Sequence, residues 1–384
     1  MRKNMAKLTD LMRDKKARCI FLMLIATAMA AVAGNSFLSQ REPFLIKTGP
    51  GVTEVRHLRD YSGNLADTRG DTEVYLLAGK EPGGTVLILG GTHPNEPAGH
   101  VAAVVIVENV TMERGRLFVI PKANSSGFMV SDPQEANPQS FSIDTPSGKR
   151  LFRYGSRGTS PMDQWPDPDI YLHYPSGQTL SGNQTRNLNR AFPGRPDGNF
   201  TERVAFAITE IVKREKVDLV IDLHEASPEY PVINAIVAHE RAMPLAVAVV
   251  MNLELRGIKI ALEPSPANLH GLTHRELGDH TEALAVLMET ANPAQGRLRG
   301  RTSADLIVSG RDKMYVRAKK AGRLFVDFDE GGHPLDRERV ARHLAGIEEF
   351  LKALQEENPA KPVEFRNFPL SEKIASGGLG PYLR

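Results

Sequence analysis

The stretch from Thr85 to His100, TVLILGGTHPNEPAGH, constrains the fold and chemistry of this chain more than any other. It opens with an apolar run, Thr85 to Leu89, which is typical of a buried strand. Gly90 and Gly91 then predict a sharp turn at the carboxyl end of that strand. Binding sites in open α/β sheets form at this edge. We therefore expect the residues that follow the glycines to take part in function.

His93 and Glu96 follow the turn and are three residues apart. If the loop curls into a helical turn, an imidazole nitrogen and a carboxylate oxygen face the same point. This pairing suits zinc, which takes nitrogen and oxygen ligands and needs a third ligand from elsewhere in the chain. A solvated histidine and glutamate on a loop is the alternative, and partners further along the chain decide between the two.

The amino terminus has the composition of an export signal. Seven basic residues lie within residues 1–18 and precede an apolar run from Cys19 to Ala33. Ala31-Val32-Ala33 offers a cleavage site of the A-x-A type, so we expect residues 1–33 to be a cleaved signal peptide. An uncleaved anchor over residues 19–38 is the alternative, since about 20 residues are needed to span a bilayer. Either reading predicts an exported protein, periplasmic or extracellular, or one held at the membrane by this segment alone.

Charge and cysteine content exclude several classes of function. The formal net charge is +2, but residues 1–18 contribute +5, which leaves about −3 for the rest of the chain. Nothing in this balance favours nucleic acid as a partner. Cys19 is the only cysteine, so a mature chain without the signal would have no disulfide.

Apolar strands alternate with helices along the remaining chain. We expect strands at 71–78, 85–89, 116–121, 217–223 and 281–288, and helices at 97–108, 201–213, 240–255 and 335–355; the glycine-rich segment 79–84 is expected to form a hairpin-like turn between the first two strands. This order predicts an α/β fold with a mainly parallel, mixed, twisted sheet and helices on both faces. His93, His224 and Glu289 would then meet at one edge of the sheet. We expect an amino-terminal arm at 34–69 and an extended tail at 357–384.

A long polar segment interrupts this alternation. Residues 125–182 are rich in proline, glycine, serine and aspartate, and ordinary connections in compact domains are much shorter. We expect an insertion that either forms a wall of the site or extends into solvent.

Four motifs in the same order resemble the zinc carboxypeptidase superfamily, and most closely its succinylglutamate desuccinylase and aspartoacylase branch. They are HPNE at 93–96, NLNRAFPG at 187–194, DLHE at 222–225 and ETANPAQG at 289–296. The resemblance covers residues 70–356, which we expect to form the catalytic domain. It implies one zinc ion held by His93, Glu96 and His224, and a substrate carboxylate held by Asn189 and Arg190. It also places Glu289 at the position of the catalytic glutamate.

Two positions depart from the pattern of this branch. Asn187 stands where an aspartate is usual, and the usual upstream arginine that polarises the scissile carbonyl is missing. Arg186 is the nearest arginine and is our candidate for substrate binding. Arg150, Arg153 and Arg157, from the insertion, are alternatives.

The resemblance implies a zinc-dependent hydrolase that cleaves an amide bond next to a free carboxylate. An N-acyl amino acid is the first candidate substrate. The export signal favours a second candidate, a metallocarboxypeptidase acting on the carboxyl terminus of a peptide such as a cell-wall stem peptide. A non-catalytic zinc- or carboxylate-binding protein is a third possibility, against which Glu289 argues because such a protein needs no base. The oligomeric state does not follow from the sequence.

Overall fold

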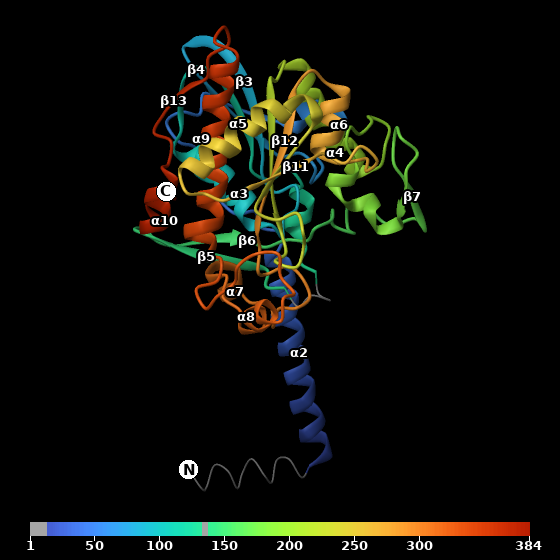
Figure 1. Cartoon of the computed structure of the whole chain (residues 1–384). Coiled ribbons are helices and arrows are strands. Elements are labelled where there is room, and N and C mark those ends of the chain that lie inside the picture. The colour runs from blue at the N-terminus through green and yellow to red at the C-terminus, as the bar shows by residue number, and fades with distance from the viewer. Residues whose placement is uncertain (1–13, 133–136) are drawn as a thin grey trace. The chain divides into compact units, whose positions relative to one another are not determined.

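The computed structural model describes residues 14–132 and 137–384 (Figure 1). The chain divides into two units, Met1–Pro43 and Phe44–Arg384. Arg2, Lys3, Lys7 and Arg13 of the predicted signal lie outside the described residues.

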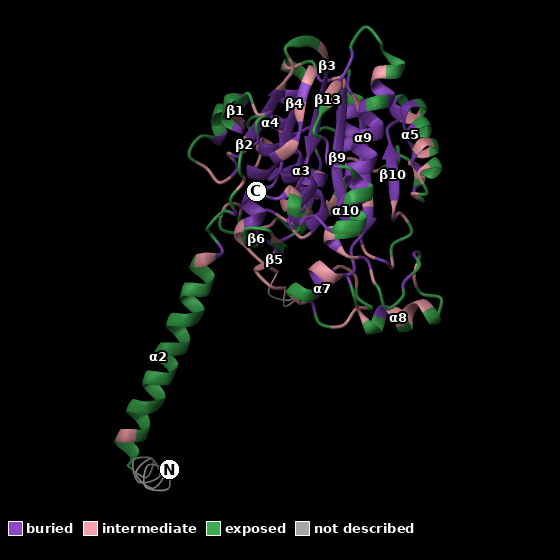
Figure 2. Ribbon diagram, turned by 90° about the vertical axis from the view of Figure 1, so that its left-hand side faces the viewer, coloured by how far each residue is buried: buried purple, intermediate pink, exposed green. Residues whose placement is uncertain are grey.

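A single long helix dominates the first unit. Helix α2, Lys15–Ser39, is 25 residues long and contains an 18-residue stretch with a mean hydropathy of 2.0, and none of its residues is buried (Figure 2). It therefore continues beyond the predicted cleavage site at Ala33. By length and composition it is able to cross a membrane, and a signal sequence near an amino terminus meets the same test. Both predicted alternatives, signal and anchor, are compatible with it.

A nine-stranded mixed sheet forms the centre of the second unit. Eight strands follow the order β1-β2-β4-β3-β9-β12-β10-β11, and β13 pairs with β4. The strands are β1 (Glu54–His57), β2 (Glu73–Ala78), β3 (Glu81–Leu89), β4 (Thr111–Ile120), β9 (Leu219–Ala226), β10 (Ala235–Ala238), β11 (Ala261–Pro264), β12 (Leu284–Ala291) and β13 (Glu364–Arg366). The four neighbours β4, β3, β9 and β12 are mutually parallel. The predicted α/β class with a mixed sheet is confirmed.

The predicted hairpin between the first two strands of the domain is wrong. Strands β2 and β3 are not neighbours, because β4 lies between them, antiparallel to β2 and parallel to β3. The reason lies in β3, whose last six residues are all buried and which is hydrogen-bonded on both edges. Such a strand belongs at the centre of a parallel sheet, and helix α3 (Pro97–Asn109) supplies the crossover that parallel pairing requires.

Helices cover both faces of this sheet (Figure 2). Side chains of α3 (Pro97–Asn109), α5 (Met243–Leu255) and α9 (Val340–Glu357) share one apolar core with alternate sheet residues such as Ile88 and Ile221. Side chains of α4 (Phe200–Arg214) and α6 (Thr273–His280) share the other core with Leu89 and Val220. This alternation follows from the two-residue period of a strand, which sends successive side chains to opposite faces.

The segment 125–182 is more ordered than a solvated excursion. It contains two hairpins, β5 (Ser140–Thr145) with β6 (Gly148–Arg153), and β7 (Ile170–Leu172) with β8 (Thr179–Ser181). Phe141 and Phe152 of the first hairpin are buried and stack with their ring centroids 5.7 Å apart. Both ring centroids also lie 6.2 Å from that of His100 in α3, and these contacts attach the hairpin to the domain.

Short elements lie in the segments predicted as arm and tail. Strand β1 pairs with β2, and β13 with β4, so both segments add to the main sheet. The remaining α-helices of the described residues are short: α7 (Ala304–Ser309), α8 (Lys313–Lys320) and, in the tail, α10 (Ser371–Gly377).

Candidate metal and substrate site

A glycine turn delivers His93 and Glu96 from the end of β3. Gly91 has a positive φ of 70°, and a Cβ there would lie 2.8 Å from the Phe128 ring and from the Pro121 carbonyl oxygen. Glycine is the residue that fits both constraints. The backbone then turns tightly, with the Glu96 amide donating to the His93 carbonyl at 2.9 Å. The two side chains therefore face the same point, as the three-residue spacing predicts.

His224 joins this pair from strand β9. The three side chains are buried, and their potential ligand atoms lie within 4.8 Å of one another. His93 Nδ1 is 2.9 Å from Glu96 Oε1, and His224 Nδ1 is 2.9 Å from Glu96 Oε2. The two histidine Nδ1 atoms are 3.1 Å apart. Two imidazole nitrogens and one carboxylate thus converge in the donor set that zinc prefers.

The outward nitrogens of both histidines have buried partners. His224 Nε2 is 2.8 Å from Asp222 Oδ2, whose other oxygen accepts a 2.8 Å hydrogen bond from the Thr92 hydroxyl. His93 Nε2 is 2.8 Å from Asn187 Oδ1. Such outer partners fix the tautomer so that the remaining nitrogen is free for a metal. The contact of Asn187 with His93 was not predicted from the sequence. The available signal was that Asn187 stands where this family usually has an aspartate.

The electrostatics of this cluster favour a positive charge at its centre. Burial disfavours the charged form of His224, but Asp222 and Glu96 outweigh burial and raise the pKa of His224 well above its ordinary value. Burial and the neighbouring Arg157 lower the pKa of His93 to about 4. Burial opposes ionisation of Glu96, yet the two histidines hold its pKa well below the usual range. A divalent cation would replace the proton that His224 otherwise holds.

Glu289 lies beside His224 because the two residues are register partners on the parallel strands β12 and β9. Its Oε2 atom is buried and has no hydrogen-bond partner within residues 14–132 and 137–384. Burial, reinforced by the charge of Glu96, raises the pKa of the Glu289 carboxyl to about 8. A carboxyl with these surroundings is suited to exchanging protons near neutral pH.

Asn189 and Arg190 line a cavity of about 490 Å³ together with Glu96 and Glu289. The Arg190 guanidinium donates to the Asn189 carbonyl oxygen at 2.6 Å and has no carboxylate partner in the part of the chain described. Burial and the charge of Arg157 lower its pKa to about 10. The Asn189 side-chain oxygen accepts from the Thr273 amide at 2.8 Å, which leaves its amino group as a donor. Two donors without an anion therefore lie beside the buried cluster.

The candidate arginines have different surroundings. Arg186 is held by Asp167 through two contacts of 2.6 and 2.8 Å. Arg150 is paired with Glu108, and Arg153 is buried. Arg157 alone among the four contacts the predicted ligands, with its guanidinium 2.8 Å from Glu96 Oε1. The insertion therefore contributes a cation to the cluster.

A second group of possible metal ligands includes His270: one side-chain atom each of His173, His270 and Glu276 lie within 4.8 Å of one another. His270 Nδ1 and His280 Nε2 contact the two oxygens of Glu276 at 2.9 and 3.1 Å, and His274 bonds Ser265. Nearby His173 has both ring nitrogens occupied by Ser176 and the Phe192 carbonyl. The His173 nitrogens thus contact groups outside this second set, whereas both Nδ1 atoms of the first cluster contact other members of the cluster.

Comparison with known proteins bears directly on the predicted family. Residues 175–306, about a third of the chain, match the family model of the succinylglutamate desuccinylase/aspartoacylase catalytic domain. This segment is similar to the catalytic domain of that family. His224, Glu289, Asn189 and Arg190 lie inside the matched segment. His93 and Glu96 lie before it, and their place in the site rests on the geometry above.

One curated relative is similar to part of the chain. The N-alpha-acetyl-L-2,4-diaminobutyric acid deacetylase of Halomonas elongata is 26% identical over 159 residues, which is 41% of this chain and 33% of that protein. The chain thus matches about a third of the length of this relative. The names of the family and of the relative both describe removal of an acyl group.

Two solved structures are similar to parts of the chain. A succinylglutamate desuccinylase from Silicibacter sp. TM1040 shares 19% identity over 59% of this chain and 55% of its own, with a TM-score of 0.35. The tripeptide-bound cell shape determinant Csd4 from Helicobacter pylori shares 13% identity over 79% of this chain and 58% of its own, with a TM-score of 0.44. At these scores neither similarity bears on function.

Proposed function

We propose that this protein is a zinc-dependent hydrolase that cleaves an amide bond next to a free carboxylate, acting on N-acyl amino acids. The convergence of His93, Glu96 and His224 beside Glu289, whose Oε2 has no hydrogen-bond partner among the described residues, carries this proposal. The deacylase family of residues 175–306 supports it.

The donor set fits one zinc ion. Each histidine directs Nδ1 toward Glu96 while its Nε2 is fixed by Asn187 or Asp222, so three ligands are preoriented. Three protein ligands are the usual number for a catalytic zinc ion. When bound, zinc polarises a carbonyl group and lowers the pKa of a nearby water molecule.

Glu289 acts as the proton carrier in this proposal. Its free Oε2 takes a proton from the attacking water and returns it to the nitrogen of the leaving amine. A pKa of about 8 belongs to the metal-free site, and a nearby cation lowers it toward the range in which the carboxylate is ionised at neutral pH. General acid–base transfer of this kind contributes about 10²–10⁴-fold in rate.

Arg190 and the Asn189 amino group hold the substrate carboxylate in the 490 Å³ cavity. A guanidinium binds a carboxylate through two parallel hydrogen bonds, which fixes the substrate's orientation. Arg157 is our candidate for polarising the scissile carbonyl, since it contacts Glu96 and lines the same cavity, whereas Arg186 is held by Asp167.

A metallocarboxypeptidase acting on peptides is the second candidate. It is favoured by a further cavity of about 570 Å³ that shares Arg157 and Gln295 with the first. Such a volume accommodates an acyl part much larger than an acetyl group. Action outside the cytoplasm, as the apolar helix α2 suggests, would fit a periplasmic or cell-surface peptide.

The test is to assay amine release from a panel of N-acyl amino acids and carboxy-terminal peptides by the zinc-loaded protein and its Glu289→Gln variant. We expect the variant to bind one zinc ion per chain and to lose hydrolysis. Full activity in the variant would refute the assigned base. Zinc binding without hydrolysis of any substrate by the unaltered protein would favour the non-catalytic binding protein.

A further inference from the structure

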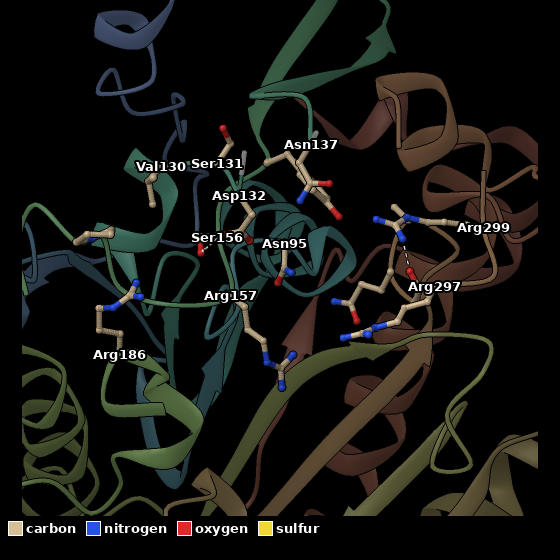
Figure 3. Close-up of a pocket in the computed structure, with 15 residues that line it drawn as sticks. Asn95, Val130, Ser131, Asp132, Asn137, Ser156, Arg157, Arg186, Arg297 and Arg299 are labelled. Carbon is tan, nitrogen blue, oxygen red and sulfur yellow. Dashed lines mark hydrogen bonds between the residues drawn. The ribbon is translucent and has the colours of Figure 1, made fainter. Parts of the chain in front are cut away.

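The 570 Å³ cavity is distinguished by its arginines. Arg157, Arg186, Arg297 and Arg299 line it, and Asp132 is the one acidic residue among the described lining residues (Figure 3). Arg157 contacts Glu96 and Arg186 is paired with Asp167, so Arg297 and Arg299 are the two cations of this cavity that have no part in the proposed zinc chemistry. Cations that line a concave surface attract an anionic ligand.

The four arginines differ in how far they are already engaged. Arg186 is committed to Asp167, and Arg157 contacts Glu96. Arg299 donates to the Thr302 hydroxyl at 2.9 Å and to the Gly296 carbonyl oxygen. Arg297 is exposed, and its guanidinium has no ion pair among the residues that the structure describes. In Figure 3 the side chains of Arg297 and Arg157 extend toward the same space.

Hydrogen bonds to Glu229 hold the turn that carries Arg297 and Arg299. Glu229 accepts hydrogen bonds from the backbone amides of Arg297 and Leu298 at 2.8 and 2.6 Å, and from the Tyr315 hydroxyl at 3.0 Å. The carboxylate thus holds the backbone of the turn and leaves the Arg297 guanidinium outside this contact. This anchoring reduces the entropy that the turn would lose when a ligand binds.

The position of the cavity decides which part of a substrate it receives. The two cavities meet at Arg157 and Gln295, which both donate to Glu96 Oε1, at 2.8 and 3.2 Å. Arg190, on the far side of this meeting point, lines only the smaller cavity. A substrate whose carboxylate is held by Arg190 therefore extends its acyl part toward Arg297 and Arg299.

We propose that Arg297 and Arg299 form an acyl-side subsite for a peptide that carries a carboxylate. The substrate class is then an acidic peptide, anionic on both sides of the scissile amide, in place of a short neutral acyl group. This inference rests on the proposed hydrolase. The volume and the excess of arginines support it independently of the metal cluster.

The test uses pairs of peptides that differ only in Glu or Gln at the residue on the amino side of the scissile bond. Arginines that remain partly exposed to water bind a carboxylate only moderately better than a neutral amide. We therefore expect kcat/KM to be about tenfold higher for the Glu peptide than for the Gln peptide. In the double variant Arg297→Gln/Arg299→Gln this preference should vanish. Arg317→Gln/Arg323→Gln, which removes two exposed charges that line neither cavity, is the matched control and should keep the preference.

A measurement of peptide binding distinguishes failure of the subsite from failure of the proposed hydrolase. Calorimetric titration of each peptide into the Glu289→Gln protein should show tighter binding of the Glu peptide, and the added arginine substitutions should remove the difference. Equal binding and cleavage of the two peptides would overturn the subsite. A preference that survives the double variant would assign the charge recognition elsewhere. Charge-selective binding without any cleavage would leave the subsite standing and overturn the hydrolase.

Discussion

The two cavities at the carboxyl edge of the sheet are built from different kinds of structure. The 490 Å³ cavity takes Leu287, Glu289 and Val237 from the sheet, and Glu96 and the Oε2 atom of Glu289 are buried. The 570 Å³ cavity is lined by loops from the insertion and from residues 294–299. Sheet residues hold groups at fixed separations, whereas loops change composition without loss of the core. The reaction is therefore expected to depend on the first cavity and the choice of substrate on the second.

Removal of a predicted metal ligand should have the largest effect. His224→Ala leaves Asp222 and Glu96 without the imidazole between them, so we expect loss of stoichiometric zinc and hydrolysis at background. Metal analysis after dialysis, together with the amine-release assay, measures both. Retention of zinc with normal affinity would show that the metal, if any, binds elsewhere.

The carboxylate clamp should come next. Arg190→Ala should lower kcat/KM by about 10²–10³-fold, because a buried substrate carboxylate then lacks its charged partner. Arg190→Lys should recover part of this loss, since a lysine keeps the charge but not the paired geometry. Initial rates across substrate concentrations test this. An unchanged kcat/KM in Arg190→Ala would place the clamp at another residue.

Arg157 links the two cavities and should give an intermediate effect. We expect Arg157→Gln to lower kcat by about 10–100-fold, since one hydrogen-bond donor to the developing oxyanion is lost at a partly exposed position. The matched variant Arg186→Gln should leave kcat within about threefold, because its guanidinium is engaged by Asp167. The reverse order of effects would identify Arg186 as the polarising group.

Zinc should stabilise the protein more at alkaline than at acidic pH. In the metal-free protein the raised pKa of His224 contributes stability below pH 6.5 that is lost as pH rises through its folded value. The raised pKa of Glu289 acts in the same direction, and its contribution is lost between about pH 4.5 and 8. Protons also compete with the metal less as pH rises. The increase in Tm on adding zinc should therefore be larger at pH 8.5 than at pH 6, and an equal increase at both would contradict the coupling.

The sequence predicted the sheet-derived part of this comparison better than the loop-derived part. The strands ending near His93, His224 and Glu289 were visible as apolar runs, because burial on two faces leaves a strong pattern. The hairpin between β2 and β3 was wrong, since chain neighbours were taken as sheet neighbours, and only long-range pairing inserts β4 between them.

The arginines show the limit of prediction most clearly. Arg186 was chosen as the arginine nearest to the place where the family usually has its upstream arginine, but its ion pair with Asp167 depends on the fold of the insertion. Arg297 and Arg299 carry no periodic or motif signal, and nothing in their spacing indicates a cavity. The contact of Asn187 with His93 joins residues 94 positions apart, and local pattern does not show it.

The pairing of Glu289 with His224 across two parallel strands has one more consequence. Neighbouring strands are about 4.8 Å apart, and this spacing is set by backbone hydrogen bonds that side chains do not alter. The sheet thus fixes the distance between the backbone positions of the proposed base, Glu289, and the proposed metal ligand, His224. Descendants of this protein can exchange the loops at 125–182 and 294–299 for new substrates while the distance on which the chemistry depends stays the same.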